Sequence, residues 1–234
     1  MATVGHMAVL PTPTAVLLDL DGTLVHTVPT RVDAWIAALA DFGIPTDRDY
    51  VASMIGSDGV QLARDAGERV GIPMRRARAA EIDARHGEIY AALNTAPAVL
   101  PGVHDLVESL RSAGVPWAIA TSSSSAGQVR ASVAALRLAE PPVVVDGSQV
   151  EHAKPAPDLF LLAAERLGVD DPGQIWCVGD ATWDVLAALA AGMTAVAVTA
   201  GSAVDARLLK ASGAHLVVET LHDLVPLVGA VPEA

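Results

Sequence analysis

The sequence contains very little cysteine and few aromatic residues. Cys177 is the single cysteine, which excludes an intramolecular disulfide and any metal site built from several cysteines. Its place inside the apolar run IWCVGD indicates core packing rather than a nucleophile, because nothing there lowers the pKa of the thiol. Aromatic residues make up 3% of the chain, and its four tryptophans are too scattered to form a base-stacking platform.

Positive charge is also scarce, since 15 Lys and Arg face 27 Asp and Glu for a net charge of −12. This balance disfavours nucleic acids and anionic membranes as partners, because both require a positive field. No uninterrupted apolar run reaches the roughly 18 residues that span a bilayer. The first residues also lack the charged start and long apolar middle of a secretion signal. We therefore predict a cytoplasmic protein that acts on a small molecule.

What the chain does contain is enough apolar residue for a full core. With 234 residues, 52% of them hydrophobic and 18% charged, disorder is excluded and one core with a smaller companion domain is expected. Short, almost continuously apolar runs, typical of strands covered on both faces, begin at Ala15, Pro116, Pro142, Ile175, Thr194 and His215. Segments with helical spacing separate most of them. This alternation predicts an α/β fold with a doubly wound parallel sheet.

One connection breaks the alternation. Residues 29–97 contain several segments with helical spacing and no convincing strand, which predicts an inserted all-helical domain. The core domain is then formed by residues 14–28 and 98–234. Residues 1–13, with two prolines among threonines, are expected to form an irregular lead-in.

Polar residues follow several of the predicted strands. In an open parallel sheet, ligands bind beyond the carboxyl ends of the strands, so these residues should gather at one edge. They are Asp19 and Asp21 after the first strand, Thr121 and Ser122 after the second, Lys154 after the third, and Asp180 with Asp184 after the fourth.

The acidic members of this set predict a cation site. Carboxylates held close together repel one another unless a cation neutralises them or one is protonated. Hard oxygen ligands suit Mg²⁺, and the candidate ligands are Asp19, Asp21, Asp180 and Asp184. Asp19 is also a candidate nucleophile, because carboxylates form acyl phosphates. Asp21 is placed to protonate a leaving oxygen and then to deprotonate the attacking water.

The remaining members of the set are suited to binding phosphate. Lys154 and Lys210 are the only lysines among the fifteen cations, and a compact ammonium at Lys154 suits a phosphate oxygen and the nucleophilic carboxylate. The hydroxyl of Thr121 and the backbone N–H of Ser122 are candidates for the other phosphate oxygens. Capping of the helix that begins near Ser125 is the ordinary alternative for these two residues.

The segments DLDGT, ATS, KPAP and GDATWD resemble, in order and approximate spacing, the four motifs of the haloacid dehalogenase-like hydrolase superfamily. The resemblance runs from about Val16 to the end. It implies a Rossmann-like core, a Mg²⁺-dependent phosphoaspartate mechanism and a mobile cap. The helical insertion looks like the cap of the phosphoglycolate phosphatase and β-phosphoglucomutase branch, with Gly56 to Gly59 as a loop over the substrate.

The same resemblance implies roles for individual residues. Asp19 is the nucleophile and Asp21 the general acid and base, while Thr121 and Lys154 hold phosphate. Asp19, the backbone carbonyl of Asp21 and Asp180 bind Mg²⁺. Asp184 acts through water or as a supporting partner.

Several departures bear on which member of the family this is. An acid at Asp21 favours phosphate chemistry over dehalogenation, which needs no protonated leaving group. Phosphonoacetaldehyde hydrolases lack this acid and carry a cap lysine, whereas residues 29–97 contain none. Asp58 and Gly59 stand where β-phosphoglucomutases usually show an Arg-Glu pair. His26 replaces the usual aspartate at the expected hinge to the cap.

The predicted function is therefore a Mg²⁺-dependent phosphatase that acts on a small phosphorylated metabolite, either a sugar phosphate or phosphoglycolate. A phosphosugar mutase and a non-catalytic phosphate-binding protein are the alternatives. The cap arginines are expected to form a solvated face rather than a substrate site; they are Arg75, Arg76, Arg78 and Arg85. Most histidines, His86 among them, are expected at the surface or partly buried.

Overall fold

The computed structural model describes residues 10–228, and its centre is a six-stranded parallel sheet in the order β3-β2-β1-β4-β5-β6. The bounds of the strands are β1 (Ala15–Leu18), β2 (Trp117–Thr121), β3 (Val143–Asp146), β4 (Ile175–Gly179), β5 (Thr194–Val198) and β6 (Leu216–Val218). All six predicted strands are present, and the predicted α/β class is confirmed. The chain leaves β1 in one direction for β2 and β3, then returns to β4 on the other side. The resulting switch point between β1 and β4 is where open sheets bind ligands.

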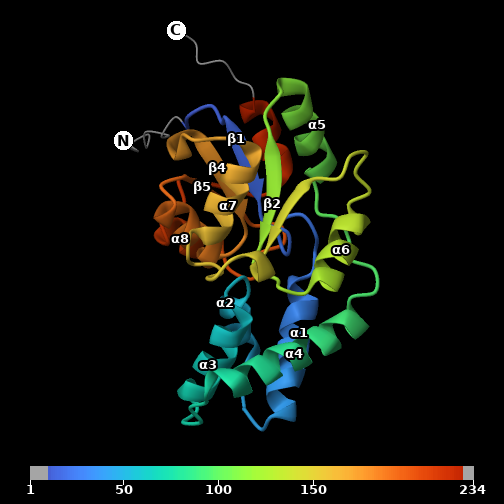
Figure 1. The fold of residues 1–234 in the computed structure, drawn as a ribbon, viewed down its shortest axis with the longest axis vertical. Helices are drawn as coiled ribbons and strands as arrows, with labels where there is room; N and C mark the ends of the chain where they lie inside the picture. The colour runs from blue at the N-terminus through green and yellow to red at the C-terminus, as the bar shows by residue number, and fades with distance from the viewer. Residues whose placement is uncertain (1–9, 229–234) are drawn as a thin grey trace, which may run out of the picture.

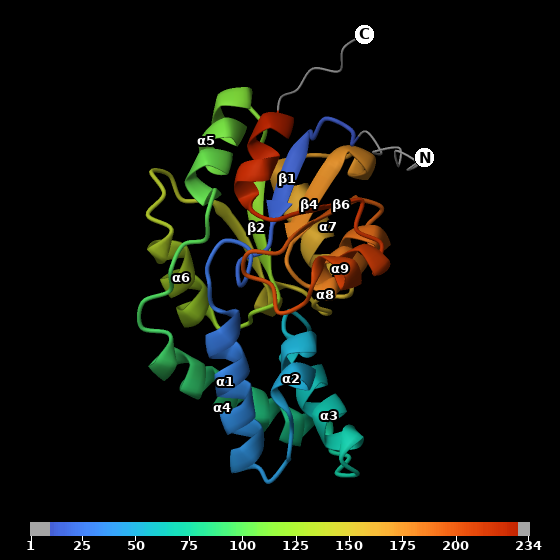
Figure 2. The same ribbon diagram turned by 180° about the vertical axis from the view of Figure 1, so that it is seen from behind.

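Helices cover both faces of the sheet (Figures 1 and 2). One face carries α5 (Val103–Ala113), α6 (Ala126–Ala135) and the 3-10 helix η3 (Leu221–Leu227), and the other carries α7 (Asp158–Leu167), α8 (Thr182–Ala190) and α9 (Ala206–Ala211). Alternate residues of β1 belong to the hydrophobic clusters on opposite faces of the sheet. Leu17 shares one cluster with Phe160 of α7, and Leu18 shares the other with Leu106 of α5. Burial on both faces explains the unbroken apolar runs of the strands.

Between β1 and α5 the chain forms four helices, which we call the helical insertion (residues 28–93). They are α1 (Val28–Asp41), α2 (Arg48–Met54), α3 (Gly59–Arg69) and α4 (Arg76–Leu93). They lie beyond one edge of the sheet (Figures 1 and 2) and share a hydrophobic cluster that includes Val32, Trp35, Leu62 and Ile82. Residues 29–97 contain no strand, as predicted.

The ends of the insertion's helices follow from local sequence. Pro29 stands in the first turn of α1, where its missing N–H costs no hydrogen bond. Asp47 accepts a bond from the Tyr50 N–H at the start of α2, and Asp58 accepts one from the Gln61 N–H at the start of α3. The sequence therefore sets these helix starts directly.

The chain passes between the sheet and the insertion through two adjacent segments. The His26 N–H donates to the Ala98 carbonyl over 2.8 Å, and the Leu100 N–H donates to the Leu24 carbonyl over 3.0 Å. His26 itself is exposed at this junction. The entry and exit of the insertion are thus tied to each other.

Several smaller features complete the fold. Two short 3-10 helices are η1 (Gly147–Gln149) and η2 (Pro172–Gln174). Of the predicted lead-in, residues 1–9 lie outside the described part of the chain, while the Pro11 carbonyl accepts a 2.9 Å bond from Trp176 Nε1. Cys177 is buried in β4, where burial raises the pKa of its thiol well above the usual value, in keeping with a packing role. No helix within residues 10–228 has the length and apolar character that a bilayer crossing requires.

Candidate active site

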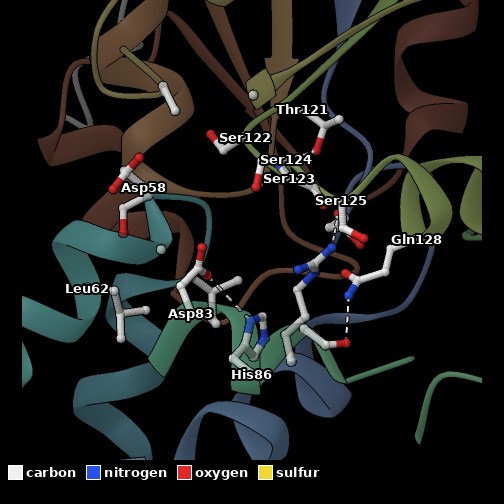
Figure 3. Close-up of a pocket in the computed structure, with 18 of the residues that line it drawn as sticks. Asp58, Leu62, Asp83, His86, Thr121, Ser122, Ser123, Ser124, Ser125 and Gln128 are labelled. Atoms are coloured by element: carbon white, nitrogen blue, oxygen red, sulfur yellow. Dashed lines mark hydrogen bonds and ion pairs between the residues drawn. The ribbon is translucent and has the colours of Figure 1, made fainter. Parts of the chain in front are cut away.

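The residues predicted at the strand ends gather at the edge of the sheet that faces the helical insertion. A cavity of about 560 Å³ lies between the two, and Asp19, Asp21, Thr121 and Ser122 are part of its lining. Its opposite wall comes from the insertion. Figure 3 shows Thr121 and Ser122 to Ser125 across the cavity from Asp58, Asp83 and His86.

Next to the cavity lies a buried cluster of charges. Asp19, Asp180 and Asp184 each offer a carboxylate oxygen, and these oxygens lie within 4.8 Å of one another. Lys154 is fully buried, with its Nζ 2.7 Å from Asp19 Oδ1 and 2.7 Å from Asp184 Oδ1. The same ammonium donates to the Ala120 carbonyl over 2.7 Å. Residues far apart in the chain are thus joined by one lysine.

Burial dominates the ionisation of this cluster. It raises the pKa of Asp19 to about 7, although the charge of Lys154 opposes the shift. Burial, followed by the charges of Asp184 and Asp19, raises the pKa of Asp180 well above its usual range. For Lys154, burial lowers the pKa, but the charges of Asp184 and Asp19 outweigh it and the net shift is upward. The raised pKa values of Asp19 and Asp180 show that this site disfavours further negative charge, which a bound divalent cation would offset.

The positions of Asp180 and Asp184 are fixed by short-range contacts. Thr23 Oγ1 donates to Asp180 Oδ1 over 3.3 Å, and the Ala181 N–H donates to Asp184 Oδ2 over 2.9 Å. Gly22 has a φ of +90°, and a Cβ there would lie 2.2 Å from Asp180 Oδ2. Glycine is therefore required at position 22 for both its backbone conformation and its lack of a side chain. The donor set is all oxygen, which suits Mg²⁺ or a similar hard cation.

Asp21 has different partners from those expected. Its carboxylate accepts bonds from Thr27 Oγ1 at 2.7 Å and from Arg31 of α1 at 2.6 Å, with the Tyr90 hydroxyl at 3.4 Å. Lys154 pairs with Asp19, the carboxylate to which the sequence analysis assigned it, whereas the pairing of Arg31 with Asp21 was not predicted. The two acids are tolerated together because each has its own cation.

Aromatic rings continue from Arg31 into the insertion. The Arg31 guanidinium lies over the Tyr90 ring, 4.2 Å from its centroid. His86 lies between Tyr90 and Trp35, and it is stacked on Trp35 with centroids 4.1 Å apart. These contacts join α1 to α4 along the side of the cavity.

Besides the bonds to Asp21, three hydrogen bonds to backbone carbonyls hold the insertion against the core. Ser122 Oγ donates to the Gly56 carbonyl at 3.0 Å, Gln128 Nε2 to the Gly87 carbonyl at 2.7 Å, and Trp183 Nε1 to the Ser53 carbonyl at 3.1 Å. Gly56 to Gly59, the predicted loop over the substrate, lie in the cavity wall.

The hydroxyls of Thr121 and Ser122 do not cap α6, whose N-cap residue is Ser125. Thr121 Oγ1 accepts a 3.2 Å bond from the Ser123 N–H. Both residues face the cavity instead.

The four cap arginines expected on a solvated face do not line the cavity. Arg85 forms ion pairs with Asp41 and Glu88, and Arg78 lies over the ring of Phe42. The arginine that does line it is Arg31, which sequence reasoning missed as a site residue.

Sequence reasoning also missed His86 and Asp83 as residues of the cavity. Asp83, His86 and Tyr90 follow one another at spacings of three and four, so they share one face of a helix. This spacing was the available signal in the sequence. His86 is 5% exposed, so the prediction of a surface or partly buried histidine was wrong for this residue.

Comparisons with known proteins show what the chain is similar to. A family model described as haloacid dehalogenase-like hydrolase matches residues 13–192. The chain is 34% identical to Probable phosphatase IndB of Dickeya dadantii, over 90% of this chain and 91% of that protein. It is 35% identical to hexitol phosphatase A of Escherichia coli, over 79% of this chain and 82% of that one.

Two further similarities cover most of the chain. Identity to a phosphoglycolate phosphatase of Rhodospirillum rubrum is 33%, over 81% of this chain and 80% of that protein. The crystal structure of a hydrolase from Pseudomonas syringae superimposes with a TM-score of 0.84 at 31% identity, covering 91% of this chain and 96% of that one.

Proposed function

The chain belongs to the haloacid dehalogenase-like hydrolase family, and we propose that it is a Mg²⁺-dependent phosphatase that cleaves a small phosphomonoester through a phosphoaspartate on Asp19. The observation that carries the proposal is the buried contact of Lys154 with Asp19, 2.7 Å long, at the edge of a cavity also lined by Asp21 and Thr121. The relatives named as phosphatases support the same chemistry.

In the first half of the reaction, a carboxylate oxygen of Asp19 attacks phosphorus and the bond to the leaving oxygen breaks. Asp21 gives its proton to that oxygen, which leaves as an alcohol. In the second half, Asp21 takes a proton from water as the water attacks the phosphoaspartate. The products are inorganic phosphate and the free carboxylate of Asp19.

Lys154 orients the nucleophile and lowers the negative charge that an incoming phosphate meets. The Thr121 hydroxyl and the Ser122 backbone N–H bind phosphate oxygens from the cavity side.

Asp19, Asp180 and the backbone carbonyl of Asp21 would hold the Mg²⁺ ion, with Asp184 supporting it through its contact with Lys154. When bound, the ion neutralises charge on the transferring phosphoryl group.

We also propose the domain division predicted from the sequence, in which residues 29–97 act as a cap over a core of residues 14–28 and 98–234. The hydrogen bonds from Ser122, Gln128 and Trp183 to backbone carbonyls of the cap support a closed arrangement. The substrate would be a small phosphorylated metabolite in the cavity. The cytoplasmic location stays a prediction.

A phosphatase fits the cavity better than a mutase does. A mutase that handles a bisphosphate needs a cation for the second phosphate. Asp58 stands where β-phosphoglucomutases usually show an arginine or glutamate of an Arg-Glu pair, and it presents a carboxylate to the cavity. The retained set of Asp19, Asp21 and Lys154 also argues against a protein that only binds phosphate.

The test is release of inorganic phosphate from a panel of phosphorylated sugars, phosphoglycolate, nucleotides and p-nitrophenyl phosphate, with Mg²⁺ and with chelator. We expect chelator-sensitive release from one class of compound, restored by excess Mg²⁺. Absence of release from every compound, p-nitrophenyl phosphate included, would overturn the proposal.

A further inference from the structure

The wall that the helical insertion gives to the cavity offers little available positive charge. Its acidic residues are Asp58, Asp83 and Glu88, and among the described lining residues the only arginine or lysine is Arg31. Arg31 already pairs with Asp21 at 2.6 Å, and Glu88 pairs with Arg85 at 2.9 Å. Among the described residues of this wall, no arginine or lysine is therefore free to receive a second anionic group.

Asp58 and Asp83 differ from Glu88 in their partners. Within residues 10–228, neither has an arginine or lysine within 4.0 Å. Asp58 Oδ1 accepts the Gln61 N–H at the start of α3, and Asp83 Oδ1 lies 3.9 Å from His86 Nδ1. Both acids are partly exposed to the cavity, so they can accept hydrogen bonds from a bound molecule.

His86 supplies an independent sign of a ligand. Its side chain is 6% exposed, and its Nε2 has no hydrogen-bond partner although it is buried. Burial lowers the pKa of His86 below the usual value, and the nearby charge of Arg31 acts in the same direction. The ring is therefore neutral at pH 7, with one nitrogen able to donate a hydrogen bond and one able to accept. Figure 3 shows His86 beside Asp83 at the cavity.

We infer that Asp58, Asp83 and His86 select a leaving group that carries several hydroxyls and no second anionic group. This inference rests on the proposed phosphatase activity. Hydroxyls donate to carboxylates and bond to imidazole in either direction. A carboxylate or second phosphate at this end would meet two like charges at a partly buried site and no available cation. The substrate class is then a sugar or sugar-alcohol monophosphate, and phosphoglycolate is disfavoured.

The test compares two substrates that differ in one group, glucitol 6-phosphate and 6-phosphogluconate. Both are open six-carbon chains with a 6-phosphate, and the end carbon is an alcohol in one and a carboxylate in the other. With the full chain and Mg²⁺, we expect kcat/KM to be at least about tenfold higher for glucitol 6-phosphate, mostly through KM. Hydrolysis of p-nitrophenyl phosphate, whose ring has no end group of this kind, reports the basic reaction.

The variants Asp83→Asn and Asp58→Asn/Asp83→Asn should reduce this preference, the double variant by about tenfold. Asparagine also caps helices well, so position 58 keeps its role at α3. Circular dichroism checks that the variants fold. Asp49→Asn removes the same charge at an exposed position of α2 outside the cavity and should leave the preference unchanged.

The possible outcomes distinguish failure of the inference about the leaving group from failure of the proposed phosphatase activity. If p-nitrophenyl phosphate is hydrolysed but 6-phosphogluconate is used as well as glucitol 6-phosphate, the inference is overturned and the phosphatase stands. The same holds if the double variant folds and keeps the full preference. If no phosphate ester is hydrolysed, both fail together.

Discussion

The ion pairs of Lys154 in the core differ from those on the surface of the helical insertion in burial and in sequence separation. In the core, Lys154 is fully buried and joins Asp19 and Asp184, one of them 135 residues away. In the insertion, Arg78 and Glu81 pair at the surface, three residues apart on one helix and with both side chains more than half exposed. Buried pairs are costly to break, whereas exposed pairs contribute little.

This difference separates two tasks within one cavity. The sheet edge provides a fixed arrangement for attack on phosphorus, because its charged side chains are buried and follow directly after strands of the sheet. The insertion provides a wall whose polar groups remain available to a leaving group. Substitutions in the core should therefore affect every substrate, and those in the insertion should affect the choice among substrates.

The largest effect is expected from Asp19→Asn, which removes the nucleophile of the core. An amide does not form the acyl phosphate, so turnover should fall on the order of 10⁴-fold or more for every substrate. Phosphate release checks this, and circular dichroism checks that the fold is kept. Asp170→Asn, at an exposed loop position, serves as the control with the same charge change. Substantial turnover in Asp19→Asn would remove Asp19 from its assigned role.

The next effect concerns stability and compares the only two lysines of the chain. Lys154→Met leaves two carboxylates without their buried cation and should lower the free energy of unfolding by about 3–5 kcal/mol. Lys210 donates to the carbonyls of Ala214 and His215 near the surface, so Lys210→Met should cost about 1 kcal/mol. Urea unfolding at pH 7 measures both. Equal losses for the two variants would show that burial does not set the difference.

A smaller effect is expected from Asp21→Asn, at the junction of core and insertion. An alkyl phosphate has a poor leaving group that depends on protonation, so its turnover should fall about 10²–10³-fold. The loss with p-nitrophenyl phosphate should be clearly smaller, because that leaving group needs no proton. Asp33→Asn, on the exposed side of α1, provides the matched control. A loss of equal size for both esters would contradict the acid role.

Much of the fold could be predicted because its strands and helices follow from the spacing of apolar residues within short segments of the sequence. Strands buried on both faces produce unbroken apolar runs, and the helical spacing noted within residues 29–97 corresponds to helices α1 to α4. The predicted family membership is confirmed by the family model. The gathering of Asp19, Thr121 and Asp180 at one edge also follows from parallel strand topology, since carboxyl ends of parallel strands meet there.

The parts that were missed depend on packing between elements. The ion pair of Arg31 with Asp21 is set by the direction in which α1 leaves the loop after β1, and no residue spacing encodes that direction. His86 is buried because α4 packs its ring on Trp35 of α1. A single sequence shows that Asp83, His86 and Tyr90 share a helix face, but not which partner covers that face.

The smallest effect expected is an acid sensitivity confined to the insertion. Burial lowers the pKa of His86, so below about pH 6.5 the unfolded chain binds a proton that the folded chain resists. The contribution of neutral His86 to stability is therefore complete above that pH and is lost as the pH falls toward the folded-state pKa. The slope from this group is at most about 1.4 kcal/mol per pH unit.

His86→Phe removes the titrating ring and keeps an aromatic ring against Trp35. The stability of this variant relative to the wild type should therefore improve as the pH falls from 7.5 to 5. Urea unfolding at the two pH values measures the change, and His86→Leu should show the same sign because the property removed is titration rather than shape. A stability difference that is independent of pH in both variants would mean that folding does not shift the pKa of His86, and a relative stability that worsens toward pH 5 would mean that the folded protein holds the histidine charged.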